Sequence, residues 1–325
     1  MAAWKEIVDY TVPSNTTSVT FNNFGTITKD DFIKINATIV NNNVGNVAIG
    51  ILGNSSVSSN YHRQSLSASG SIVAAARAND HFVSGINALK TTNMMIYGKL
   101  SENDRLNLFS NTFQEIDSAV QNTFFYTTSS GVTFADHITS LTFTSNVTNG
   151  IGAGSRIQIY KLTAKKVADI LVTSNTTQVD ITGLDIKKGD EYLLVGEHNW
   201  ATLNQGLSLF ANNNTTATNY FSQQIRGNGS NADASRTNGS LIVNSAQPGQ
   251  PNLFYSHIKL SNIGAYTAQN YVIRRMGSEL QTQNYFLSSS AENITSITNL
   301  TLSTNNNGIG SGSRFELYRL YKGGN

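Results

Sequence analysis

The sequence predicts an all-β protein: two tandem antiparallel β-sandwich domains of jelly-roll type, related by an internal duplication. Three observations lead to this prediction. Apolar and polar residues alternate in many short segments, clusters of Gly and Asn separate these segments, and a long repeat runs through the chain. Asn, Thr, Ser and Gly favour turns and strand faces, and only 13% of the residues are charged.

The repeat defines the domain organisation. Residues 307–320 (NGIGSGSRFELYRL) match residues 149–162 (NGIGAGSRIQIYKL) at nine of fourteen positions, at an offset of 158. Three other stretches recur at offsets of 159 or 160, namely SNTTSV at 14–19, SSNYHRQ around Tyr61 and ARAN at 76–79. A period near 160 is too long for a solenoid repeat and predicts two domains of one fold. We place them at 1–164 and 165–325, with the boundary in LTAKKVAD.

Strand patterns fill each half of the chain. FIKINATIV (32–40) puts Ile33, Ile35 and Ile39 on one face, and ITSLTFTS (138–145) puts Leu141 and Phe143 on one face. Only a few segments, such as the alanine-rich SIVAAARA (71–78), suggest short helices.

The glycine-rich stretch at 149–154 has two interpretations. A phosphate-binding loop lies between a strand and a helix, whose free N–H groups face the anion. Here strand patterns lie on both sides, and no Lys-Ser/Thr pair follows the glycines. The stretch therefore predicts the tip of a closing β-hairpin, in which glycine supplies positive φ angles.

The same residues resemble a known family. EIVDYTVPSNTTSVTFNNF near the start, SSNY, and the ending ITSLTFTS…GAGSRIQIYKL are similar to the small virion structural proteins of tailed bacteriophages. Both halves fit this frame, although YKL and YRL stand where the family ends in YGI, and the second copy has no aromatic residue matching Trp4. The resemblance implies a non-enzymatic, assembled component of the virion exterior, on the capsid or the tail.

Composition limits the other function classes. A net charge of +2 gives no strong field for nucleic acid or an acidic membrane surface. The sequence contains no run of 18 apolar residues, so it predicts no membrane-spanning segment. Its N-terminus has no signal-peptide pattern. The chain has no cysteine, which fits assembly in the host cytoplasm before incorporation into the virion.

Sequence motifs for catalysis are lacking. The five histidines are scattered without metal-ligand spacing, and none recurs at the repeat offset. No Gly-x-Ser-x-Gly motif indicates a nucleophile. We therefore expect no enzyme activity, no cofactor and no metal site.

Several polar and aromatic residues are candidates for contacts. Three pairs occupy matching places in the two halves, and one tryptophan stands alone in the loop 199–204: Tyr61 and Tyr220, Arg77 and Arg236, Arg156 and Arg314, and Trp200. Each pair either braces its own domain or forms matching interface or glycan contacts, because Tyr and Arg are enriched at interfaces.

These observations favour one function and leave an alternative. The first is a structural protein of the virion exterior that contacts other virion proteins and forms homo-oligomers. It would be a capsid decoration or head-fibre protein, or part of the tail appendage. The alternative is a receptor-binding module that recognises host surface glycans through an aromatic groove, which we expect near Trp200.

Overall fold

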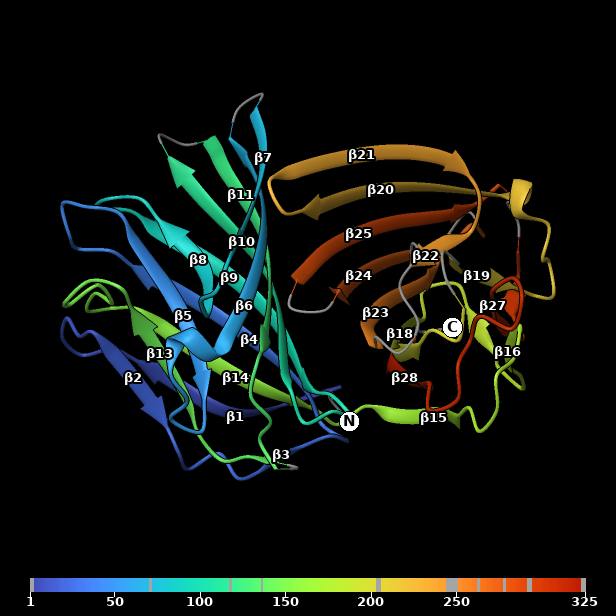
Figure 1. Ribbon diagram of the computed structural model, residues 1–325, viewed down its shortest axis with the longest axis horizontal. Coiled ribbons are helices and arrows are strands. Elements are labelled where there is room, and N and C mark those ends of the chain that lie inside the picture. Colours follow the sequence, from blue (N-terminus) through green and yellow to red (C-terminus); the bar gives the residue numbers. More distant parts are fainter. Residues whose placement is uncertain are drawn as a thin grey trace.

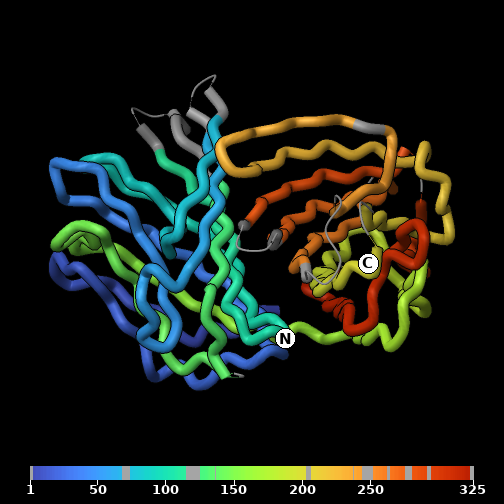
Figure 2. The backbone as a smooth tube through the Cα atoms, viewed as in Figure 1, coloured from blue at the N-terminus to red at the C-terminus, as the bar shows by residue number. Residues whose placement is uncertain are grey.

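The computed structural model describes residues 3–69, 72–116, 119–135, 137–202, 206–243, 251–261, 264–276, 279–290 and 294–322. It is an all-β fold in two similar parts, and every strand pair recorded in it is antiparallel (Figure 1). The first domain ends its last strand at Leu162 and the second begins its first strand at Lys165. The N-terminal end lies beside this crossing (Figure 2), where the Thr163 amide donates to the Ala3 carbonyl.

Each domain contains a large eight-stranded sheet, a small four-stranded sheet and a two-stranded pair. In the first domain the eight-stranded sheet has the order β1 (Trp4–Thr11), β14 (Arg156–Leu162), β4 (Phe32–Val40), β9 (Thr91–Leu100), β10 (Leu106–Ile116), β11 (Ala119–Ser130), β6 (Tyr61–Ser69), β7 (Ile72–Ala78). The four-stranded sheet has the order β2 (Ser18–Phe21), β13 (Leu141–Ser145), β5 (Val47–Gly53), β8 (Phe82–Ile86), and β12 (His137–Ile138) pairs with β3 (Ile27–Thr28).

The second domain repeats this order strand for strand. Its eight-stranded sheet contains β15 (Lys165–Leu171), β28 (Arg314–Tyr321), β18 (Glu191–Asn199), β23 (Pro251–Leu260), β24 (Tyr266–Met276), β25 (Glu279–Ser289), β20 (Tyr220–Asn228), β21 (Asn231–Asn238). Its smaller sheets contain β16 (Gln178–Ile181), β27 (Leu300–Ser303), β19 (Leu207–Ala211), β22 (Leu241–Val243), and the pair β17 (Ile186–Lys187) and β26 (Ser296–Ile297). Short 3₁₀ turns at Ser58–Asn60 and Ala217–Asn219 precede β6 and β20.

The strand order is that of a jelly roll with two inserted hairpins. In the first domain β1-β14-β4-β9 faces β2-β13-β5-β8, so the chain passes repeatedly between the two sheets. The hairpins β6–β7 and β10–β11 extend only the large sheet. The second domain has the same insertions, which confirms the predicted duplication of one jelly-roll fold.

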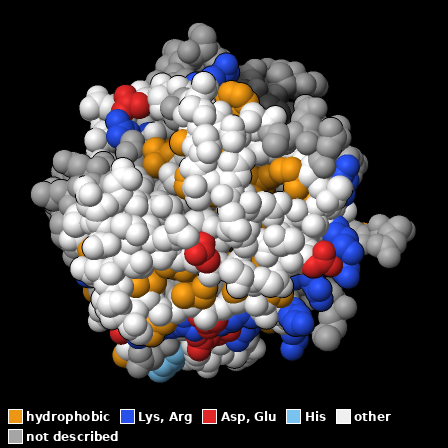
Figure 3. All heavy atoms as spheres, turned by 90° about the vertical axis from the view of Figure 1, so that its right-hand side faces the viewer, with side chains coloured by type: hydrophobic (Ala, Val, Ile, Leu, Met, Phe, Trp, Pro, Cys, Tyr) orange, Lys and Arg blue, Asp and Glu red, His pale blue; other side chains and the backbone are white. Residues whose placement is uncertain are grey.

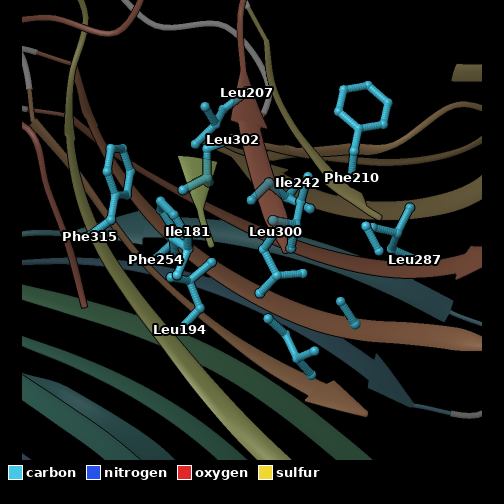
Figure 4. Packing of buried hydrophobic residues seen from close by; sticks show 14 of the residues in the cluster. Ile181, Leu194, Leu207, Phe210, Ile242, Phe254, Leu287, Leu300, Leu302 and Phe315 are labelled. Carbon is cyan, nitrogen blue, oxygen red and sulfur yellow. The ribbon is translucent and has the colours of Figure 1, made fainter. Parts of the chain in front are cut away.

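The alternating patterns place the core as predicted. Ile33, Ile35 and Ile39 are fully buried on β4, and Leu141 and Phe143 are fully buried on β13. In the second domain the two sheets contribute facing apolar side chains (Figure 4). Leu194 and Phe315 come from the large sheet, and Leu300 comes from the small one.

Two local predictions are wrong. SIVAAARA contributes strand β7, because residues 72–78 pair with β6 along the edge of the large sheet, so tertiary pairing overrides the helix propensity of alanine. The glycine loop does not close a hairpin either: β13 and β14 belong to different sheets, so residues 146–155 cross between the layers. Gly154 has a φ of 84°, but at Gly152 a Cβ would lie only 2.7 Å from the Val40 carbonyl oxygen, so close approach requires glycine there.

A third apolar cluster joins the two domains. It lies where β18, β23, β24 and β28 of the second large sheet meet β4, β9 and β10 of the first (Figure 1). Phe32, Tyr97 and Phe109 of the first domain contact Tyr255 and Tyr271 of the second, with ring centroids 4.5–5.7 Å apart. These side chains are almost fully buried, so the contact between domains resembles a core.

Candidate functional site

The paired tyrosines lie in the interior. Tyr61 and Tyr220 are at most 1% exposed, and each begins the strand that follows a 3₁₀ turn. The Tyr61 hydroxyl accepts a hydrogen bond from the Gly53 amide at 2.9 Å, and the Tyr220 hydroxyl accepts one from the Ala211 amide at 3.0 Å. Buried in this way, both brace their own domain and leave no surface for a glycan or partner, contrary to the contact hypothesis.

Arg156 and Arg314 open the last strand of each jelly roll and share one local contact. Arg156 binds Asp9 through two hydrogen bonds of 2.9 and 2.6 Å, and Arg314 binds Asp169 in the same way at 2.9 and 2.8 Å. The neighbouring carboxylates raise the pKa of Arg314 further above its usual value. This fork geometry braces the edge strand in each copy.

Arg314 has an additional role between the domains. Its Nη1 atom donates to Asp30 at 3.2 Å and to Glu102 at 3.1 Å, and both acceptors belong to the first domain. Arg314 therefore binds the first domain as well as its own, and both domains belong to the same chain.

A buried charge cluster continues this contact. Lys99 of the first domain lies 3.9 Å from the Glu197 carboxylate and 3.5 Å from the Glu316 carboxylate, and it donates to the Lys29 carbonyl. The Glu102 amide donates to Glu197 at 2.8 Å. Burial raises the pKa of Glu197 to about 7, although Lys99 counteracts the shift.

Arg77 and Gln64 hold the end of a hairpin of the second domain. Gln64 is fully buried; its amide donates to the Gly229 carbonyl at 3.0 Å and accepts from the Gly229 amide at 2.8 Å. Arg77 donates to Asn228 at 3.2 Å and to the Leu280 carbonyl at 3.0 Å. Arg77 is thus an interface residue, but the interface lies within one chain.

Trp200 is a core residue. It is 2% exposed and its ring packs on His198, with 4.0 Å between the ring centroids. It also forms an isolated β-bridge with Ile309 in the glycine loop. Trp200 therefore does not line the aromatic groove that we expected near it. Residues 203–205, which follow in the same loop region, lie outside the described part of the chain.

Arg236 lies in a groove on the large sheet of the second domain. The groove has a volume of about 540 Å³ and is open to solvent. Phe221 and Phe286 are 47% and 45% exposed within it. The other side chains that project from this face are Gln223, Arg236, His257, Lys259, Thr267, Gln269 and Ser288.

The groove combines apolar rings with polar and cationic groups. Lys259 and Arg236 are both exposed. The Lys259 ammonium group forms an ion pair with the Glu191 carboxylate at 2.5 Å. Burial lowers the pKa of His257 to about 4, so its ring is neutral at pH 7. Such a surface can stack an apolar face on the phenylalanine rings and hydrogen-bond polar groups around them.

The described residues provide neither a candidate metal site nor a candidate membrane-spanning helix. No group of three or more His, Asp or Glu side chains within the described ranges could hold a metal ion. In the same part of the chain, no helix is long and apolar enough to span a membrane. The second domain's outer end carries mostly uncharged side chains, and most of its Lys and Arg side chains lie along the right and lower edges of the view (Figure 3).

The pattern of the repeats could have identified part of the groove. Gln64 and Gln223 recur at the same offset of 159 as the paired tyrosines, so the repeat marks this position of the sheet in both halves. The two phenylalanines carry no such signal, because they are 65 positions apart and meet only through the register of β20 and β25.

Comparisons with known proteins name no family. No protein-family description and no curated protein matches the chain. Among solved structures, a tesB protein of Mycobacterium avium subs paratuberculosis aligns at 5% identity and a TM-score of 0.16, covering 71% of this chain and 79% of that one. A 12:0-ACP thioesterase from Umbellularia californica aligns at 9% identity and a TM-score of 0.13, covering 70% and 74%. Likenesses this weak carry no argument about function.

Proposed function

We propose that the chain is a non-enzymatic structural component of the exterior of a bacteriophage virion, on its capsid or its tail. The observation that carries this proposal is the repeated jelly roll, a fold used by viral capsid proteins and by lectins. Fold alone does not assign a function. The ending motif at 149–162 and 307–320, which resembles phage virion proteins, supplies the second support.

The contact between the domains supports a structural role. Aromatic packing around Tyr255, the charge cluster at Lys99 and the Gln64–Gly229 pairing join the domains at three places along the large sheets. A duplicated domain held in this way presents two related surfaces in a fixed arrangement, which suits a component that contacts neighbours in a regular assembly.

The experiment is to locate the chain in particles that package its gene. Particles purified by density gradient are digested and analysed by quantitative mass spectrometry, and intact particles are labelled with gold-conjugated antibodies to the chain. We expect a fixed copy number per particle and label on the particle surface. A chain that stays in the soluble lysate and is absent from purified particles contradicts the proposal.

A second function, recognition of host surface glycans, is favoured by the groove on the second domain. Exposed Phe221 and Phe286 beside Arg236, Gln223 and Gln269 provide rings for a sugar face and donors for its hydroxyls. Binding to a glycan array that Phe286→Ala reduces at least tenfold supports this function. The control is Phe113→Ala, which removes an equally exposed ring from the first domain.

A further inference from the structure

The groove on the second domain has cationic side chains and no acidic one. Arg236, Lys259 and His257 line it among amide, hydroxyl and phenylalanine side chains, and its described lining contains neither Asp nor Glu. Glu191 neutralises Lys259, and burial keeps His257 uncharged at pH 7 by lowering its pKa to about 4. Arg236 is exposed, and no carboxylate of the described residues is paired with it. The groove therefore offers one guanidinium group that is free to bind an anion.

The two phenylalanine rings of the groove are specific to the second domain. Phe221 and Phe286 lie diagonally across the neighbouring strands β20 and β25. In the register of the first domain, His62 and Thr127 stand at these positions. The first domain forms the same fold without these rings, so the fold does not require them. Two neighbouring exposed rings provide an apolar platform for a ligand.

The first domain borders this groove on one side and leaves it open. Tyr97 packs against His257, with ring centroids 5.6 Å apart, so the covered part of the sheet reaches β23. Every described residue that lines the groove belongs to the second domain. Phe286, Phe221 and Arg236 lie on β25, β20 and β21, which follow further along the sheet, and all three are exposed. A ligand can therefore reach them in the intact chain.

The sheet itself restricts the class of ligand. β20, β25, β24 and β23 are each paired on both sides, so their backbone groups are used within the sheet. An extended peptide cannot add to these strands as a further strand, and recognition depends on side chains. Gln223 and Gln269 supply amides around the rings, and Thr267 and Ser288 supply hydroxyls. A sugar fits this arrangement, because it combines an apolar face that stacks on an aromatic ring with hydroxyl groups at its edge.

The first domain shows how a glutamine and an arginine at this place of the sheet bind oxygen atoms together. Gln64 and Arg77 are opposite each other on β6 and β7, as Gln223 and Arg236 are on β20 and β21. Arg77 donates to two carbonyl oxygens of the second domain at 3.0 and 3.2 Å, beside the glycine that Gln64 holds. Arg236 has the same strand position and no such acceptor among the described residues. An oxygen-bearing ligand can therefore take that place.

We propose that the groove binds a carboxylated sugar residue, a uronic acid or a sialic acid, of a host surface glycan. Phe221 and Phe286 contact the apolar face of the sugar, and Gln223 and Gln269 hydrogen-bond its hydroxyl groups. Arg236 binds the carboxylate through two hydrogen bonds, because the guanidinium fork matches the two carboxylate oxygens. The inference rests on glycan recognition, the second function proposed above, and specifies the class of sugar.

Two matched pairs of oligosaccharides test the charge requirement with the full chain. The first pair is a hyaluronan tetrasaccharide and the same tetrasaccharide with its carboxylates reduced to alcohols. The second pair is 3′-sialyllactose and lactose. Calorimetric titration at low ionic strength should show binding of at least one acidic probe that is about tenfold tighter than binding of its neutral counterpart. Tighter binding in the first pair alone identifies a uronic acid, and tighter binding in the second pair alone identifies a sialic acid.

Variants identify the group that holds the carboxylate. Arg236→Gln should weaken binding of the acidic probe about tenfold without changing the melting temperature, because Arg236 is exposed. Arg236→Lys keeps the charge but loses the fork, so binding should weaken about threefold. The control is Arg226→Gln, which removes a positive charge from the same strand pair outside the groove. It should change the affinity by less than about twofold.

The possible failures can be told apart. Equal affinity for acidic and neutral probes, or acidic binding that Arg236→Gln leaves unchanged, overturns this inference and leaves glycan recognition in place. A chain that binds neither acidic probe and no glycan on the array contradicts glycan recognition and this inference together. Self-association that Phe286→Ala abolishes in a chain that binds no sugar has the same consequence, and it assigns the groove to contacts between chains.

Discussion

Gln64 and Gly229, one from each domain, exchange two hydrogen bonds in the manner of neighbouring strands. The side-chain amide of Gln64 donates to the Gly229 carbonyl at 3.0 Å and accepts from its N–H at 2.8 Å. The glutamine thus recognises backbone atoms of the hairpin. Because Gln64 is fully buried, loss of either bond leaves a polar group without water.

Replacing this glutamine should destabilise the chain. We expect Gln64→Leu to lower the free energy of unfolding by about 2–3 kcal/mol, since the N–H and C=O of Gly229 lose their partner in a buried contact. Urea denaturation at pH 7 and submicromolar concentration measures the change. Gln223→Leu at the exposed equivalent position should change it by less than about 0.5 kcal/mol. Equal effects of the two substitutions would show that Gln64 does not hold the hairpin.

Glu197 should make the contact between domains sensitive to pH. Burial raises the pKa of this carboxyl from 4.5 to about 7, so the folded chain binds a proton that the unfolded chain has already released. The stability that Glu197 contributes is present below pH 4.5 and is lost as the pH rises to about 7. The expected loss between pH 5.5 and 8 is on the order of 1–2 kcal/mol.

The variant Glu197→Gln isolates this effect, because other groups titrate in the same range. The difference in unfolding free energy between wild type and Glu197→Gln should change between pH 5.5 and pH 8. Above pH 8 this difference should stay constant. Lys99 keeps Glu316 at 3.5 Å in the variant, so one ion pair remains. Glu191→Gln, which removes an exposed carboxylate, serves as the control. A constant difference for Glu197→Gln contradicts the raised pKa.

His198 should make the second domain acid-labile. Its ring is fully buried and burial lowers the pKa to about 3, so the folded chain keeps it neutral while the unfolded chain protonates it near pH 6.5. The stability it contributes is present above pH 6.5 and is lost as the pH falls, by about 2 kcal/mol at pH 5.

Isoleucine is the natural replacement, because Ile39 occupies the corresponding position on β4 of the first domain. Calorimetry at pH 7 and pH 5 should show that His198→Ile loses less stability on acidification than the wild type does. An unchanged acid response in the variant would mean that the destabilising protonation occurs at another histidine.

The sequence predicts the fold better than the site, for a physical reason. Alternation along one strand reports directly which face is buried, so the inward positions Ile33 to Ile39 and the two jelly rolls follow from local pattern and repeat. The chain's path between sheets is decided by pairing among distant strands. The loop at 146–155 therefore reads as a hairpin although β13 and β14 never pair.

The groove depends on such distant pairings. Gln223, Phe286 and Lys259 meet because β20 pairs with β25, β25 with β24, and β24 with β23. Whether a side chain that recurs in both halves is buried or exposed also depends on contacts with residues far away in the sequence. Gln64 is covered and Gln223 is open although an arginine lies opposite each of them, because the other domain covers the sheet at Gln64 and not at Gln223.

The two interior tyrosines provide a matched test of a bracing role against a contact role. Tyr61→Phe leaves the Gly53 amide without its acceptor, and Tyr220→Phe does the same to the Ala211 amide, both in buried surroundings. We expect each to lower the free energy of unfolding by about 1–3 kcal/mol. The double variant should be additive within about 0.5 kcal/mol, because the residues lie in separate cores. Tyr321→Phe, at an exposed ring, should have little effect. Unchanged stability of Tyr61→Phe and Tyr220→Phe, together with loss of self-association or glycan binding, would return both residues to the contact role.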